Sequence, residues 1–322
     1  MSLRLVFMGT PAFAVPALEM ILAGEHCLLG VVTQKDRPVG RGLRPQASPV
    51  KQRARDAGVP VLEPDTARDE AFLRALRDLS PELIVVVAFG QILPKAVLDL
   101  PTMGCLNAHA SLLPKYRGAA PIQWAIVNGE SITGVTVIKM VERMDAGDIL
   151  LAKETEIGPE EDAVALGERL SHLSAEALRE ALRGMEEGTL HSIPQGEDQA
   201  TYAPRLRRED GEIDWREGAD DIARKVRGFV PWPSAFTRWR GRLLKVHKAR
   251  AIPGAQWGRP GEVVKADRGG LWVQTGEGYL DIMELQPESR PKMDARSFLH
   301  GQGEILGGIM GESITNDPGG GR

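Results

Sequence analysis

Two polar side chains that could act on a carbonyl group stand two positions apart in an apolar part of this 322-residue chain. Asn107 offers a neutral amide N–H, and His109 offers a titratable imidazole. Both follow the apolar pair Cys105 and Leu106, which predicts that they end a β-strand. A core histidine with satisfied nitrogens, next to a turn-forming asparagine, would produce the same letters. The pair therefore suggests chemistry without establishing it.

A carboxylate that could complete such a site follows a predicted strand at residues 134–141. Asp145 and Asp148 flank a turn there, before a further strand that begins near Ile149. Aspartates at turns usually bind nearby backbone N–H groups. Taken alone, Asp145 is as well explained by turn geometry as by catalysis.

The elements that must position these residues predict an α/β domain of the doubly wound type. Apolar strands are expected at 3–8, 28–33 and 83–87, and helices at 12–23, 49–57 and 68–79. Alternation of nearly all-apolar strands with helices implies a parallel sheet covered on both faces. Ligands of such sheets bind beyond the carboxyl ends of central strands. We therefore expect residues 89–94 and 107–111 to open onto one crevice.

Several classes of protein are disfavoured by what the sequence lacks. No GxGxxG follows the first strand and no GxxxxGK[ST] occurs, so we expect no nucleotide cofactor. The six histidines are scattered without metal-ligand spacing, so we expect no metal. Cys27 and Cys105 lie in apolar segments, which predicts buried, reduced thiols in the cytoplasm. No apolar run of about 18 residues is available to span a membrane.

Basic residues gather in two places. The Gly- and Pro-rich segment 34–46 carries four basic residues against one acidic one, and it is longer than most loops between a strand and a helix. The window 222–250 carries nine basic residues, no acidic residue and four aromatic ones. Both could be solvated surface, but the second favours a surface that binds a polyanion. The basic residues of the window are Arg224, Lys225, Arg227, Arg238, Arg240, Arg242, Lys245, Lys248 and Arg250.

Length and composition predict two domains. Residues 1–188 form the first, with a core helix at 163–185, and the polar, turn-rich segment 189–206 reads as a linker. Residues 207–322 form the second, with a helix at 219–228 and short strands near 243–246, 261–264, 271–275 and 279–285. That pattern predicts a small antiparallel barrel. Residues 301–322 are expected to be a loose tail.

Five motifs together resemble the folate-dependent formyltransferases. They are MGTPAFAVPAL, TQKDRPVGRG, FGQILP, NAHASLLPKYRGAAPIQWA and MDAGDIL, in the order and approximate spacing of that family. The resemblance spans nearly the whole chain. It implies a Rossmann-like catalytic domain with a mainly parallel sheet, joined to a smaller β-barrel domain of OB type.

The resemblance also implies a reaction and a site. Formyl would pass from 10-formyltetrahydrofolate to the α-amino group of methionyl initiator tRNA, with Asn107, His109 and Asp145 as the catalytic residues. The folate-contacting SLLP segment of the family falls on Ser111, Leu112, Leu113 and Pro114, and the facing wall would be Phe89, Gly90, Gln91, Ile92 and Leu93. Residues expected to hold tRNA are Arg37, Arg41, Arg44, Lys225, Arg227, Arg240, Lys245 and Lys248. We expect a cytoplasmic monomer.

The proposed trio suits formyl transfer physically. Attack by an amine turns the formyl oxygen into an oxyanion, which needs N–H donors already aimed at it. Asn107 and His109 can supply donors, and Asp145 can stabilise the imidazolium or hold a water that moves a proton. The motifs do not fix the acceptor. An amino-sugar nucleotide, glycinamide ribonucleotide, or a folate- or RNA-binding role without transfer remains open.

Overall fold

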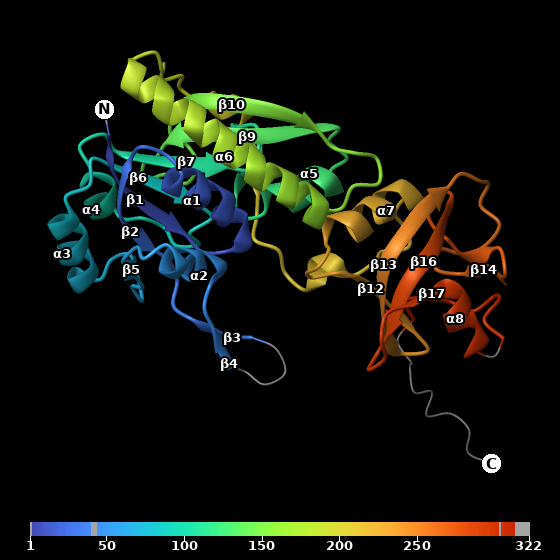
Figure 1. Cartoon of the computed structure of the whole chain (residues 1–322). Coiled ribbons are helices and arrows are strands. Elements are labelled where there is room, and N and C mark those ends of the chain that lie inside the picture. Colours follow the sequence, from blue (N-terminus) through green and yellow to red (C-terminus); the bar gives the residue numbers. More distant parts are fainter. Residues whose placement is uncertain (1, 40–43, 303, 313–322) are drawn as a thin grey trace. The chain divides into compact units, whose positions relative to one another are not determined.

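The computed structural model describes residues 2–39, 44–302 and 304–312 and forms two compact units (Figure 1). Unit 1 comprises Met1–Pro121, Ser131–Ile157 and Ala165–Pro204. Unit 2 comprises Ile122–Glu130, Gly158–Val164 and Arg205–Arg322. The segment expected to be a linker therefore belongs mostly to unit 1, and the C-terminal segment of unit 2 begins at Arg205.

Unit 1 is built on a seven-stranded sheet in the order β10-β9-β7-β6-β1-β2-β5. Its central strand, β6, is the apolar run LIVVV, and every residue of that strand is buried. Strands β7, β6, β1, β2 and β5 run parallel, whereas β9 and β10 run antiparallel to their neighbours. The strands are β1 (Arg4–Gly9), β2 (Cys27–Val32), β5 (Val61–Leu62), β6 (Leu83–Val87), β7 (Cys105–His109), β9 (Ile132–Lys139) and β10 (Ile149–Glu156). This confirms the predicted Rossmann-like sheet.

The helices of unit 1 follow the local signals closely. The Ser48 side chain caps α2 by accepting a hydrogen bond from the Lys51 N–H, and Asp69 caps α3 in the same way. The long helix α6 buries Leu166, Leu170 and Ala177, as its leucine stripe predicts. The helices are α1 (Val15–Leu22), α2 (Pro49–Asp56), α3 (Glu70–Leu79), α4 (Lys95–Leu98) and α6 (Ala163–Glu187), with a 3-10 turn at Ala12–Ala14. Among the described residues, no helix has the length and apolar character that crossing a bilayer requires.

The basic segment 34–46 contains more structure than its composition suggested. Strands β3 (Arg37–Val39) and β4 (Arg44–Gln46) pair antiparallel, and residues 40–43, including Arg41, lie outside the described part of the chain. Beside this hairpin, the Lys51 side chain is 5% exposed and contacts Asp36 at 2.6 Å and Glu63 at 2.7 Å. A buried ammonium requires such partners, and they tie the start of the hairpin segment to α2.

The two cysteines differ, although both were expected to be buried. Cys105 on β7 is buried, and burial raises the pKa of its thiol to about 12. Cys27 is exposed because it is the first residue of β2, where the strand emerges from the sheet. The prediction was wrong for Cys27, since an apolar neighbourhood in sequence does not locate the end of a strand.

Unit 2 contains an antiparallel sheet and, among its described residues, the helices α7 and α8 and nearly all of α5 (Pro121–Val127). Its strands run in the order β12-β13-β16-β15-β14, and β17 pairs with β16. The helix α7 (Ala219–Gly228) matches its predicted bounds, whereas β12 and α8 (Ala295–His300) were not anticipated. The strands are β12 (Ala235–Trp239), β13 (Arg242–Ile252), β14 (Val263–Asp267), β15 (Gly270–Gln274), β16 (Tyr279–Pro287) and β17 (Met293–Asp294).

The predicted loose tail is wrong for residues 304–312. Ile305 and Met310 are buried in the core of unit 2, Met310 forms a bridge with Trp239, and Ile309 forms one with Glu262. These bridges join the chain's last described segment to the β12 end and the β14 end of the sheet. The sheet is thereby closed in the manner of a small barrel. Residues 303 and 313–322 lie outside the described residues.

Candidate active site

Two of the predicted catalytic residues share one face of a strand in the sheet of unit 1. Asn107 and His109 lie on β7, which pairs in parallel with β6 and antiparallel with β9. Residues two apart on a strand point to the same side. The His109 side chain is buried at 8% exposure, while Asn107 is half-buried. The sheet therefore holds both groups on rigid backbone at the carboxyl end of β7.

Asp145 reaches both of them from the turn after β9. Lys139, the last residue of β9, pairs with Leu106, so this turn returns alongside Asn107. The Asp145 Oδ1 atom lies 3.5 Å from Asn107 Nδ2 and 3.7 Å from His109 Nδ1. Its Oδ2 atom accepts a hydrogen bond of 2.9 Å from the Gly118 backbone N–H. The fold thus brings Asp145 together with His109 and with Asn107, which lies 38 positions earlier in the sequence.

The hydrogen bonds of His109 define its tautomer. Its Nε2 lies 2.9 Å from the Tyr116 carbonyl oxygen, and a carbonyl can only accept, so Nε2 carries a proton. Nδ1 is then the nitrogen that faces Asp145. A proton on Nδ1 would make the ring an imidazolium held between a carbonyl and a carboxylate. The Nε2–H group of His109, which was expected to donate to an oxyanion, already donates to the Tyr116 carbonyl oxygen. The N–H donor that remains available to an oxyanion is the side-chain amide of Asn107.

The backbone around Asp145 is held in an unusual conformation. Asp145 has a φ of +50°, a left-handed value that side-chain-bearing residues rarely adopt. At Gly147 a Cβ atom would lie 1.8 Å from the Lys139 carbonyl oxygen, so only glycine fits there. This turn is specified by its surroundings rather than by its own preferences.

Sequence reasoning missed side chains that contact the backbone of the Asp145 turn or one another, namely Gln195, Arg117 and Glu197. The Arg117 guanidinium is 1% exposed and pairs with Glu197 at 3.1 Å. Hydrogen bonds from Arg117 hold the pKa of the Glu197 carboxyl below its usual range. Gln195 contacts Arg117 as well. The one available signal was Arg117 itself, an arginine in a Gly- and Ala-rich loop, but its partners lie about 80 residues away in the presumed linker.

The predicted folate segment after His109 is folded tightly against β9. The Ser111 hydroxyl donates to the Lys115 carbonyl at 2.7 Å, and the Leu113 N–H donates to Thr136 Oγ1 at 3.0 Å. Ser111 and Leu113 are buried, whereas Leu112 and Pro114 are half-buried. The side chains left for a ligand are therefore Leu112 and Pro114, with Ser111 shaping the loop.

The predicted folate-contacting segment after β6, Phe89–Leu93, also contains both buried and accessible residues. Phe89 and Leu93 are buried in the hydrophobic core of unit 1, and the Gln91 side chain accepts a hydrogen bond from the Ala67 N–H. Ile92 is 65% exposed, an unusual state for a large apolar residue. Gly90 adopts a φ of +82°, which turns the chain so that Ile92 faces outward. Gly90 and Ile92 remain available to a ligand.

Basic residues of the acid-free window have partners elsewhere in unit 2, a carboxylate for Lys225 and a backbone carbonyl for Arg227. Lys225 contacts Glu217, and Arg227 donates to the Glu161 carbonyl oxygen at 2.9 Å. Lys248 is exposed and Lys245 half-buried on β13, and neither forms an ion pair with another described residue. The positive potential of this region therefore rests on fewer side chains than the sequence count implies. Arg37 and Arg44 lie on β3 and β4, but their side chains are outside the described part of the structure.

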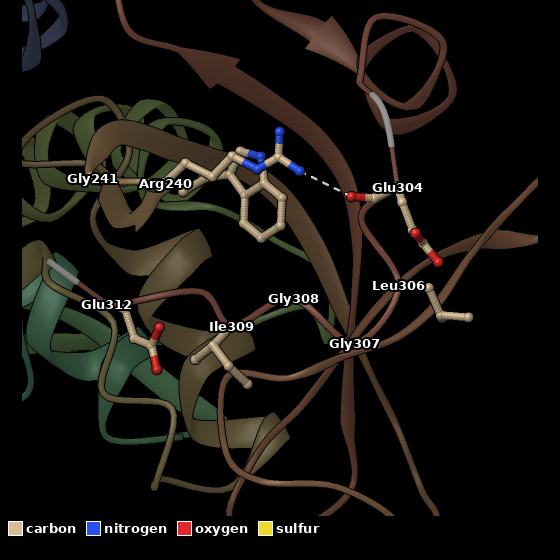
Figure 2. A pocket seen from close by; sticks show the side chains of 9 residues that line it. Arg240, Gly241, Glu304, Leu306, Gly307, Gly308, Ile309 and Glu312 are labelled. Carbon is tan, nitrogen blue, oxygen red and sulfur yellow. Dashed lines mark hydrogen bonds between the residues drawn. The ribbon is translucent and has the colours of Figure 1, made fainter. Parts of the chain in front are cut away.

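Arg240 lines a cavity of about 550 Å³ in unit 2 (Figure 2). The Arg240 guanidinium sits 5.1 Å from the Trp239 ring centroid and donates to the Glu304 carbonyl oxygen at 3.0 Å. Glu304 and Glu312 also line the cavity, which makes it unsuitable for a phosphate. Among the described residues, no three His, Cys, Asp or Glu side chains gather as a metal site would require.

Comparison with known proteins identifies both parts of the chain. A family model described as formyl transferase matches residues 3–182, and one described as formyl transferase, C-terminal domain, matches residues 205–303. Among solved structures, HypX from Aquifex aeolicus in complex with tetrahydrofolic acid superposes with a TM-score of 0.64 at 21% identity. That match covers 96% of this chain, which spans 48% of HypX.

A second solved structure shares the fold over its full length. The N-formyltransferase from Helicobacter canadensis, solved with folinic acid and dTDP-3-aminofucose, has a TM-score of 0.63 at 17% identity. The match covers 91% of this chain and 100% of that one. At this level of identity both structures show a common fold.

Curated relatives are much more similar. Methionyl-tRNA formyltransferase from Solibacter usitatus is 48% identical over 93% of this chain and 96% of its own length. The enzyme of the same name from Syntrophus aciditrophicus is 47% identical over 96% of this chain and 99% of its own length. With both domains matched and identity of this order along nearly the whole chain, the protein belongs to the methionyl-tRNA formyltransferase family.

Proposed function

We propose that this enzyme transfers the formyl group of 10-formyltetrahydrofolate to the α-amino group of methionyl initiator tRNA. The observation that carries the proposal is the convergence of Asn107, His109 and Asp145 at the carboxyl end of β7. Identity of 44–48% with curated methionyl-tRNA formyltransferases extends through both units, which favours tRNA over a smaller acceptor. The product would be ready for translation initiation in the cytoplasm.

Asn107 is proposed as the donor that stabilises the oxyanion. The amine attacks the formyl carbon, a C–N bond forms, and the carbonyl oxygen takes up negative charge. The Asn107 Nδ2 atom lies 3.5 Å from Asp145 Oδ1, which is too long for a strong hydrogen bond. Its N–H groups are therefore available to a closer and more negative oxygen when the substrate is bound.

His109 and Asp145 are proposed to manage charge and protons. The amine must lose a proton on attack, and the folate nitrogen must gain one as its C–N bond to the formyl carbon breaks. Asp145 Oδ1 faces His109 Nδ1, so the carboxylate can stabilise an imidazolium or accept the amine proton directly or through water. The net proton transfer is from the acceptor amine to the leaving folate.

The residues present fit a folate at this edge of the sheet. Ile92 and Leu112 keep accessible apolar side-chain surface on the segments that follow the neighbouring strands β6 and β7, as contact with an aromatic ring system requires. The exposed backbone at Gly90 is accessible for hydrogen bonds to polar ring atoms. We assign folate contact to Ser111–Pro114 and Phe89–Leu93, acting through Leu112, Pro114, Gly90 and Ile92 where side chains or backbone are accessible.

The tRNA is assigned to the hairpin and to unit 2. Among the five residues of unit 2 predicted to hold tRNA, Lys245 and Lys248 are best suited to contact phosphate, because Lys225, Arg227 and Arg240 have protein partners. Arg37, Arg41 and Arg44 belong to the segment of β3 and β4 and are assigned to the acceptor end. The enzyme is proposed to act as a monomer, which sedimentation analysis of the purified chain would test.

A substrate panel tests the proposed reaction. The purified protein receives 10-formyltetrahydrofolate with charged initiator tRNA, charged elongator methionyl-tRNA, glycinamide ribonucleotide or a dTDP-amino sugar in separate reactions. Formylation of the initiator tRNA well above the others is expected. Formylation of the sugar nucleotide or glycinamide ribonucleotide instead would assign a different acceptor, and absence of turnover with all four would refute transfer activity.

A further inference from the structure

The segment expected to be a linker makes a set of contacts with the turn that carries Asp145. We call residues 192–203 the strap. Its Ser192 hydroxyl donates to Asp148 at 2.6 Å, and its Ile193 pairs with Ile149 by two backbone hydrogen bonds. Farther along, β11 (Tyr202–Ala203) pairs in parallel with β8 (Arg117–Gly118). The strap therefore contacts both the segment that follows His109 and the segment that follows Asp145, and all of these residues belong to unit 1.

Gln195 occupies the middle of these contacts. Its Nε2 atom donates to the Asp145 carbonyl oxygen at 2.8 Å and to the Gly147 carbonyl oxygen at 2.6 Å. Its Oε1 atom accepts from Arg117 Nε at 3.0 Å and from Arg117 Nη2 at 2.8 Å. Guanidinium groups only donate and carbonyls only accept, so the amide orientation is fixed by its neighbours. Gln195 matches a donor-only group on one side to an acceptor-only pair on the other.

Arg117 holds Gln195 in place. Its buried guanidinium also donates to Glu197 Oε2 at 3.2 Å and Oε1 at 3.1 Å, and a buried charge requires such partners. The next residue, Gly118, donates its N–H to the Asp145 carboxylate. A closed ring of contacts thus runs from Arg117 to Gln195, to the Asp145 backbone, and through the Asp145 carboxylate back to Gly118.

We infer that Gln195 is a positioning residue that fixes the position and orientation of the Asp145 carboxylate relative to the Asn107 and His109 side chains. The Asp145 turn has a left-handed residue and a glycine that admits no side chain, so it needs external support to persist. Gln195 supplies that support at the carbonyl of Asp145 itself. The strap extends the same control to His109, because Thr201 accepts the Tyr116 N–H at 2.8 Å and Tyr116 binds the His109 ring.

Two substitutions at Gln195 separate positioning from general stability. In Gln195→Glu, one oxygen can still accept from Arg117, but the other faces two carbonyl oxygens and repels them. Gln195→Met keeps the length of the side chain and removes all four hydrogen bonds without adding charge. Gln199→Glu is the matched control, since Gln199 is an exposed glutamine of the same strap. This substitution makes the same chemical change at a residue without a hydrogen bond to the Asp145 turn among those described.

The measurements are kcat and KM for formylation of charged initiator tRNA, with thermal unfolding of the same samples. We expect both Gln195 variants to lower kcat by about 10- to 100-fold, because a misplacement of about 1 Å can cost on the order of 10²-fold. KM values for tRNA and folate should change by less than about threefold, because the substrate-binding surfaces are not altered. Gln199→Glu should retain the wild-type kcat.

The inference rests on the proposed function, and the two fail differently. If the wild-type protein formylates none of the offered acceptors, the proposed function fails. If the wild-type protein is active and either Gln195 variant keeps its kcat within about twofold, the positioning role alone is refuted. A loss of kcat that merely equals the unfolded fraction of the sample, read from its melting curve, also overturns it, since that would be a structural role only.

Discussion

Near Asp145, the side chains of His109 and Arg117 are buried and have protein partners, whereas the basic side chains of β13 are exposed or half-buried in unit 2. Arg117 is 1% exposed and has its partners fixed by the strap. Arg250 on β13 is 57% exposed and has one partner, Asp281. Removing one member of a buried set leaves the others unsatisfied, so effects there are large and coupled. Surface charges act separately and are screened by salt.

The largest effect is expected where the buried groups meet the substrate. Asp145→Asn keeps the size of the side chain and removes the charge that faces His109, so kcat should fall on the order of 10²-fold or more. Steady-state formylation assays measure this change. Glu142→Gln, an exposed residue before the same turn, is the control and should retain wild-type activity. Near wild-type turnover by Asp145→Asn would remove Asp145 from the catalytic set.

A smaller, salt-dependent effect is expected on the surface of unit 2. Replacing both Lys245 and Lys248 with Ala should reduce the slope of log affinity for tRNA against log salt by about two, one per lost phosphate contact. Filter binding between low and moderate salt measures the slope. Lys225→Ala, whose ammonium already contacts Glu217, should change the slope less. An unchanged slope in the double variant would place the tRNA elsewhere.

The smallest effect concerns a histidine in the surface region. Burial lowers the pKa of His247 on β13 below its ordinary value, so folding favours the neutral ring. The corresponding stability is present above the unfolded-state pKa of about 6.5 and declines as pH falls through that value towards the lower folded pKa. His247→Gln should therefore lose less thermal stability than wild type between pH 7.5 and pH 5.5. Equal losses in melting temperature would contradict this contribution.

Elements with strong local signals were predicted well. The run Leu83–Val87 is the buried central strand, and α2 begins at the proline after its Ser48 cap. Helix α7 has its predicted bounds. In each case the residues that specify the element lie within it or beside it, so no distant contact was needed to recognise it.

The failures share a physical cause. Residues 304–312 carry little apolar periodicity, yet Ile305 and Met310 complete a core whose other members come from earlier strands, helices and loops. Strand β12 lies within the basic window, and its extended conformation depends on antiparallel pairing with β13. Contacts between distant segments decided each of these positions.

The sequence by itself determined the fold class, the family resemblance and the identity of Asn107, His109 and Asp145 as candidates, because residue types and local periodicity are properties of short segments. Only the tertiary structure decided that the supposed linker contacts the turn that carries Asp145. Gln195 and Arg117 are 78 positions apart, and neither has a local reason to meet the other. Their pairing exists because a buried guanidinium and two turn carbonyls, brought together by the sheet, must all be satisfied at one place.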